Sequence, residues 1–189
     1  EEYKQAGVKR IVALRGDAVA GSQIKYASDL VLFIRDFFGD SFEIDVAAYP
    51  EIHPESKGYK SDINYLKMKF ICGANSAITQ YFFNEDAYYR FVDKCYKSGI
   101  TQPIYPGVMP IINYQNLCRF SENCGAEIPR WLRKAVEDFG GCQDSLDAFS
   151  TDFISRMAEN LLNNGAPGIH FYTMNQGEPV EKIIRNISV

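Results

Sequence analysis

The chain has 189 residues, of which 46% are hydrophobic and 23% charged, a composition typical of a globular protein with one good-sized core. Its formal net charge of −4 argues against a nucleic acid or an anionic membrane as partner, because both favour clustered Lys and Arg. No apolar run approaches the ~20 residues needed to cross a bilayer, so neither partner is predicted.

Strand-like segments recur five times along the chain. Residues 1–14, EEYKQAGVKRIVAL, indicate the tail of a helix that runs through Gly7 into a strand, and without an initiator Met they suggest that an upstream segment is absent. Each strand-like segment combines apolar or β-branched residues with a polar or turn residue at its end. The predicted strands are 10–17, 42–50, 77–83, 104–111 and 168–175.

Helix-like segments separate these strands. Residues 26–39 repeat apolar residues at helical spacing, with Ser28 as the candidate N-cap and Gly39 at the end. The next three predicted helices, each with a capping residue in front and a glycine behind, are 61–74, 84–99 and 113–125. Two more helices, 129–140 and 144–165, precede the last strand.

This alternation predicts an α/β fold with parallel strands and right-handed helical crossovers, either an open doubly wound sheet or a (β/α)8 barrel. In both architectures, ligands lie at the carboxyl ends of the strands. Residues suited to such a site end the predicted strands: Asp17, Tyr49, Gln80, Pro110 and Asn175. No G-x-G-x-x-G follows the first strand, which favours a barrel, although five strands are three too few to close one.

The cysteines indicate neither a disulfide framework nor a metal site. There are five, an odd number without C-x-x-C spacing, which predicts reduced thiols and a cytoplasmic protein. Cys118 and Cys124 lack a second Cys or His pair at the distance of a zinc finger, so no metal is predicted.

Seven ordered motifs give the chain a specific resemblance. They are ALRGD (13–17), VAAYPEIHPE (46–55), DINYLKMK (62–69), GANSAITQYFF (73–83), PIYPGVMPI (103–111), RF with CGAEIP (119–129) and HFYTMN (170–175). In order and spacing they resemble the methylenetetrahydrofolate reductase family. The resemblance implies a (β/α)8 TIM barrel, of which residues 1–189 form a single domain carrying about five C-terminal βα units.

The resemblance also implies an activity. The family reduces 5,10-methylenetetrahydrofolate to 5-methyltetrahydrofolate, using FAD as cofactor and NADH or NADPH as hydride donor, in one-carbon metabolism and methionine supply. A folate and a nicotinamide dinucleotide are therefore the implied partners, together with further copies of the chain in a homo-oligomer. In the family, the glutamate thought to protonate the folate lies in the first three βα units, which the resemblance implies are absent from residues 1–189.

Site residues carry over onto the matching positions. The residues implied to bind FAD are Leu14, Arg15, Gly16, Asp17, Tyr26, Ala27, Tyr49, His53, Asp62 and Lys69. Those implied to act in catalysis are Asp17 and Gln80, and those implied to bind folate are Gln80, Phe120 and Tyr172. By this resemblance Asp17 places a carboxylate near flavin N1, and the Gln80 amide meets the pterin edge.

Local chemistry agrees with these roles, but each residue also has an ordinary structural explanation. Pro50 and Pro54 restrict the turn that carries His53, so this side chain has little entropy left to lose on binding. Taken alone, His53 fits a surface loop. Asp62 and Lys69 lie seven residues apart and share one helix face, which would be an ordinary solvated face without the motif context.

Some positions depart from the family pattern. Two family flavin contacts are here Tyr65 and Met68, and Gln176 stands where an arginine that helps to hold substrate is usual. His170 is predicted to face the core. Two rival interpretations stay open: a non-catalytic barrel fragment, and a barrel enzyme that binds a phosphorylated substrate at helix N-termini.

Overall fold

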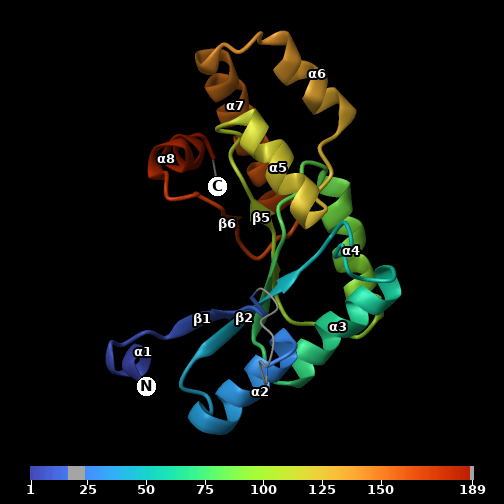
Figure 1. The fold of residues 1–189 in the computed structure, drawn as a ribbon, viewed down its shortest axis with the longest axis vertical. Helices are drawn as coiled ribbons and strands as arrows, with labels where there is room; N and C mark the ends of the chain where they lie inside the picture. Colours follow the sequence, from blue (N-terminus) through green and yellow to red (C-terminus); the bar gives the residue numbers. More distant parts are fainter. Residues whose placement is uncertain (17–23, 188–189) are drawn as a thin grey trace.

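The computed structural model describes residues 1–16 and 24–187, and its strands are all parallel (Figure 1). The strands are β1 (Arg10–Ala13), β2 (Glu43–Ala48), β3 (Ser76–Thr79), β4 (Ile104–Tyr105), β5 (Gly107–Val108) and β6 (His170–Phe171). The helices are α1 (Glu2–Gln5), α2 (Ala27–Phe38), α3 (Tyr59–Ile71), α4 (Glu85–Lys97), α5 (Tyr114–Cys124), α6 (Arg130–Asp138), α7 (Gln143–Asn163) and α8 (Gly177–Asn186). Asp17 lies outside the described residues.

The predicted strand over 104–111 is divided at Pro106. Its first part, β4, pairs with β3, and its second part, β5, pairs with β6. Proline has no N–H for a ladder, whereas its carbonyl still accepts the backbone N–H of His170 at 3.0 Å. Adjacent strands in space therefore follow chain order from β1 to β6, as in consecutive units of a barrel. The predicted α/β fold with parallel strands is confirmed.

The core lies between the strands and the helices that follow them. Alternate residues of β2, Ile44 and Val46, are fully buried. Helices α2 and α3 pack against β1 and β2 and against each other, and α7 packs against α8. Val31 on α2 and Leu161 on α7 are also fully buried, because the apolar stripes of both helices face inward.

Helix ends explain two differences from the predicted bounds. The N-cap of α2 is Tyr26, not Ser28, because the Asp29 carboxylate reaches back to accept the backbone N–H of Tyr26 at 2.9 Å. Helix α3 begins at Tyr59, after Gly58, which has a φ of 152° that suits glycine. The predicted caps in front of α4 and α5 are correct: Asn84 and Asn113 accept backbone N–H groups through their side chains.

Within residues 1–16 and 24–187, no helix combines the length and the apolar character that crossing a bilayer requires. All five cysteines are free thiols, of which Cys72 and Cys95 are buried.

Candidate functional site

Parallel pairing places three of the predicted site residues directly after strands, at the carboxyl ends of the two sheets. Tyr49 directly follows β2, and Gln80 directly follows β3, where its backbone N–H donates to the Ala48 carbonyl at 2.8 Å. Tyr172 follows β6, and its backbone N–H donates to the Val108 carbonyl at 2.9 Å. Of the predicted strand-end residues, Tyr49 and Gln80 therefore lie at the carboxyl ends of two paired strands, and Tyr172 lies at the carboxyl end of the β5–β6 sheet.

The loop after β2 holds an aromatic pair. The rings of Tyr49 and His53 meet edge to face, with centroids 4.4 Å apart. His53 Nδ1 accepts the backbone N–H of Glu55 at 3.0 Å, so the proton of the neutral imidazole lies on Nε2. Ile52 has a φ of 74°, which is strained for a β-branched residue and marks a fixed turn. The two rings are thus held in place by backbone geometry.

Asp62 and Lys69 line the same side of α3 and reach back toward β2. Asp62 Oδ2 accepts the backbone N–H of His53 at 3.0 Å, and Lys69 Nζ donates to the Ala47 carbonyl at 2.7 Å. Burial raises the pKa of Asp62 and lowers the pKa of Lys69 to about 8, against the mutual attraction of the two charges. Helix α3 therefore carries two poorly solvated ionisable groups below the Tyr49–His53 pair.

Arg15 and Glu55 join the loops that follow β1 and β2. The guanidinium donates to both carboxylate oxygens, Nη1 to Oε2 at 2.8 Å and Nη2 to Oε1 at 3.1 Å. This pair is exposed, and the neighbouring Gly16 has a φ of 70°. Leu14, also predicted at the flavin site, is 53% exposed. The Arg15 guanidinium thus lies at the edge of the site and is paired with the Glu55 carboxylate of the same chain.

Gln80 and Tyr172 are half-buried and held by their own neighbours. Gln80 Oε1 accepts the backbone N–H of Tyr81 at 3.0 Å, and within the described residues no bond engages its NH2 group. The Tyr172 hydroxyl donates to the Thr79 carbonyl at 3.0 Å, and burial raises its pKa to about 12. One amide donor and one aromatic ring are thereby presented at the carboxyl ends of β3 and β6.

Three other predicted residues lie outside these contacts. Tyr26 is 60% exposed at the N-cap of α2, and Ala27 is the first residue of that helix. Phe120 is half-buried on α5, where the Arg119 guanidinium lies 5.5 Å from its ring centroid. Within the described residues, no hydrogen bond, ion pair or ring contact joins any of the three to Tyr49, Gln80 or Tyr172.

The structure adds residues that the sequence patterns did not single out. Tyr49 and Gln80 share a narrow cleft with Pro50, Glu51, Ile52, Tyr81, Cys124, Gly125 and Ala126. Its volume of about 10 Å³ is close to that of one water. Burial raises the pKa of Glu51, although its carboxylate accepts the Glu127 N–H at 2.8 Å. The sequence feature that could have indicated this cleft is Gly125, which ends α5 in the left-handed conformation and lines the cleft.

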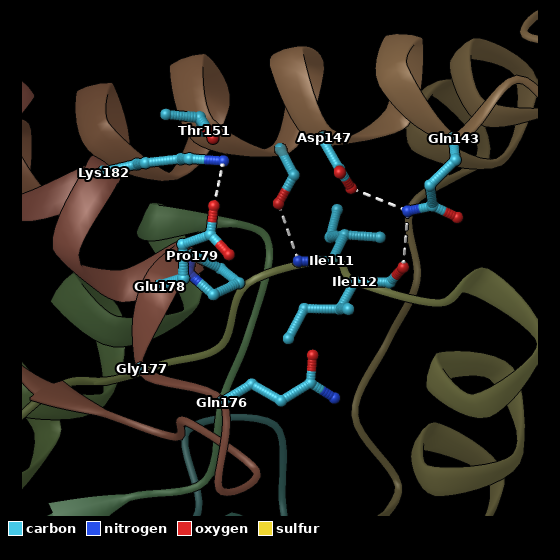
Figure 2. A pocket seen from close by; sticks show the side chains of 11 residues that line it. Ile111, Ile112, Gln143, Asp147, Thr151, Gln176, Gly177, Glu178, Pro179 and Lys182 are labelled. Atoms are coloured by element: carbon cyan, nitrogen blue, oxygen red, sulfur yellow. Dashed lines mark hydrogen bonds and ion pairs between the residues drawn. The ribbon is translucent and has the colours of Figure 1, made fainter.

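A larger groove, of about 380 Å³, lies between α7 and the first turn of α8 (Figure 2). Gln176 lines this groove, and Lys182 there is paired with Glu178 at 2.9 Å. Asp147 adds a second carboxylate, so the lining carries more negative than positive charge. None of the residues predicted to bind flavin or folate lines it.

Comparisons with known proteins agree with the motifs. The family described as methylenetetrahydrofolate reductase matches residues 1–188. A 5,10-methylenetetrahydrofolate reductase of Buchnera aphidicola from Acyrthosiphon pisum is 44% identical over 93% of this chain and 60% of its own length. A probable methylenetetrahydrofolate reductase (NADPH) of Caenorhabditis elegans is 37% identical over the whole chain but only 29% of its own length. The chain thus spans less than two thirds of either relative.

A solved structure supports the fold. It is an uncharacterized protein from Clostridium thermocellum, described as binding two copies of 5-methyl-5,6,7,8-tetrahydrofolic acid. It is similar to 95% of this chain and 71% of its own, with a TM-score of 0.62 and 20% identity. At this identity the likeness concerns the fold alone.

Proposed function

The chain belongs to the methylenetetrahydrofolate reductase family, and on this basis we propose that it supplies the flavin-binding and folate-binding wall of a reductase. The proposed reaction is the reduction of 5,10-methylenetetrahydrofolate to 5-methyltetrahydrofolate. The observation that supports it most directly is the position of Tyr49, Gln80 and Tyr172 at the carboxyl ends of strands, together with the family match over residues 1–188.

FAD is the proposed cofactor, and the chemistry of the residues fits it. A flavin dinucleotide needs flat surfaces to stack on and cationic donors for its pyrophosphate. The Tyr49–His53 pair offers the first, and Arg15 and Lys69 offer the second. When bound, FAD would supply hydride transfer between the nicotinamide and the folate. Leu14, Gly16, Tyr26 and Ala27 complete the proposed contacts.

The chain's own residues would hold and polarise the reactants. Asp62 fixes the backbone of His53, so the loop after β2 is ordered before any ligand arrives. The Gln80 NH2 group would donate to the pterin edge, while Tyr172 and Phe120 would give the folate aromatic surfaces. Asp17 is proposed to place its carboxylate near flavin N1, where it favours a cationic folate. We assign the general acid to no residue of this chain.

The hydride donor is proposed to be NADH or NADPH, and the name of the Caenorhabditis elegans relative favours NADPH. A homo-oligomer in the cytoplasm completes the proposal. Phe33 and Phe37 on α2 are 46% and 69% exposed, with ring centroids 4.5 Å apart, and they offer an apolar surface for another copy.

Two half-reactions test the proposal. The purified chain, loaded with FAD, should show flavin absorption that NADPH or NADH bleaches and that 5,10-methylenetetrahydrofolate restores. Failure to retain any flavin would favour the non-catalytic fragment. Retained flavin that no folate reoxidises would contradict the assigned substrate and direct attention to a phosphorylated one.

A further inference from the structure

Thr79 connects three strands at the base of the proposed folate site. It is the last residue of β3, it is fully buried, and it directly precedes Gln80. Its Oγ1 accepts the backbone N–H of Gly107 on β5 at 2.8 Å. Its carbonyl accepts the Tyr172 hydroxyl at 3.0 Å. A single residue thus contacts the β5 backbone just after Pro106 and the ring that follows β6.

The side chain of Thr79 replaces a missing ladder bond. Strand β4 pairs with β3 up to the partners Ile78 and Tyr105, so Pro106 stands next in register to Thr79. At Gly107 the chain leaves β3 and begins to pair with His170 on β6. The Gly107 N–H is buried at this junction and would cost free energy if unpaired. The Thr79 hydroxyl is the acceptor that satisfies it.

Gly107 is required at this junction by close packing. A Cβ added there would lie 2.1 Å from the Thr79 carbonyl oxygen and 2.6 Å from Cε2 of Tyr172. Since real Cβ atoms do not approach other atoms so closely, the Tyr172 ring rests directly on the Gly107 backbone. The bond to the Thr79 carbonyl then fixes the ring's remaining freedom.

We propose that Thr79 is a positioning residue that fixes the Tyr172 ring in one arrangement for the folate. The proposal rests on the proposed function, because that function gives Tyr172 a ligand to bind. Thr79 itself touches no reactant. Its hydroxyl fixes the Gly107 backbone, on which the Tyr172 ring packs, and its carbonyl accepts the hydrogen bond from the Tyr172 hydroxyl.

The principal test is Thr79→Val in the flavin-loaded full chain. Valine has the same shape but leaves the Gly107 N–H without an acceptor, so the β5 backbone and the Tyr172 ring should shift. We expect the KM for 5,10-methylenetetrahydrofolate to rise about tenfold. The flavin spectrum and the rate of flavin reduction by NADPH should stay at wild-type values. Thr79→Ser, which keeps the hydroxyl, should restore the KM.

A binding measurement gives a readout other than turnover. Calorimetric titration with 5-methyltetrahydrofolate should show the same loss of affinity in Thr79→Val and the same recovery in Thr79→Ser. Thr101→Val is the matched control, because Thr101 lies exposed in a loop and should leave both measurements unchanged. Should Thr79→Val fail to fold, Tyr172→Phe removes the other bond of the arrangement and should weaken folate binding with normal flavin content.

The two proposals can fail separately. If the wild-type chain retains no flavin or turns over no folate, the proposed function fails. If the wild type is active while Thr79→Val, or Tyr172→Phe in its place, binds folate with unchanged affinity, the positioning role is overturned. An equal loss in the NADPH and folate half-reactions also overturns it, since general disruption of the sheet would then account for the effect.

Discussion

Asp62 Oδ2 accepts the backbone N–H of His53 at 3.0 Å, so helix α3 holds the loop that follows strand β2. The carboxylate is half-buried, and burial raises its pKa while the His53 N–H and the Lys69 ammonium favour its charged form. A charged group in this position serves to order a loop. Removal of the Asp62 carboxylate should therefore reduce ligand affinity more than it reduces the stability of the core.

Asp62→Ala should loosen this loop and weaken FAD binding by about tenfold, because a hydrogen bond to a charged acceptor is lost. Asp62→Asn keeps an acceptor oxygen of the same reach and should retain most of the affinity. Quenching of flavin fluorescence on titration measures both. Affinity in Asp62→Ala equal to that of the wild type would show that the loop needs no support from α3.

Lys69 should make stability depend on alkaline pH. Burial lowers its pKa to about 8 from 10.5, so between these values the unfolded chain binds a proton that the folded chain has lost. The contribution of Lys69 to the free energy of unfolding therefore rises with pH, by about 3 kcal/mol over the interval. Lys69→Met should be more stable than the wild type near neutral pH, and this difference in stability should disappear as the pH approaches 10.5.

Urea unfolding at several pH values measures the difference between Lys69→Met and the wild type. The exposed Lys60 on the same helix provides the control, since Lys60→Met should show no such dependence. A stability difference that stays constant across the interval would mean that the ammonium is solvated in the folded chain. Lys69→Met should also bind FAD more weakly, because a proposed donor to the pyrophosphate is gone.

Glu55 should compete with FAD for Arg15. The guanidinium is engaged by both oxygens of Glu55, and a phosphate would need the same two donors. Glu55→Gln should therefore raise FAD affinity by about threefold at low salt, and less at high salt because exposed pairs are screened. Arg15→Gln should lower the affinity. Equal affinity in wild type and Glu55→Gln at every salt concentration would remove Arg15 from the proposed site.

Two glycines should respond to the same substitution with opposite signs. Gly107→Ala forces a Cβ against the Thr79 carbonyl and the Tyr172 ring and should lower the free energy of unfolding by about 1–3 kcal/mol. Gly177→Ala, in the first turn of α8, meets only the end of the Glu181 side chain at 4.0 Å and should raise it by about 0.5–1 kcal/mol. Urea unfolding of both variants compares them directly, and a Gly107→Ala variant as stable as the wild type would contradict the close packing of Gly107 against Thr79 and Tyr172.

The sequence predicted the parallel α/β fold and its strands well, because apolar runs ending in polar residues depend on local pattern alone. The break at Pro106 was visible as a proline inside a strand, but its consequence depends on two different neighbours. The sequence predicts Ser28 as the cap of α2, since a carboxylate reaching back from Asp29 to Tyr26 leaves a weaker signal than a hydroxyl in front of a helix.

Contacts between distant parts of the chain could not be predicted. Arg15 and Glu55 are 40 residues apart, and Tyr172 is 93 residues from the Thr79 carbonyl that it contacts. A family motif identifies Arg15 and Tyr172 as positions but says nothing of these partners. Thr79 in particular looks like an ordinary strand residue, because its role arises only where the chain at Pro106 changes its pairing from β3 to β6.

Because of the division at Pro106, one short stretch of backbone pairs with two different strands, and this affects how the protein unfolds. Residues 104–105 pair with β3 and residues 107–108 pair with β6, so opening of one sheet disturbs the strand segment that belongs to the other. The amides of both sheets should therefore lose their protection together in hydrogen exchange. We therefore expect both sheets to unfold cooperatively, because the hydrogen bond from Gly107 to Thr79 links the end of β3 to β5.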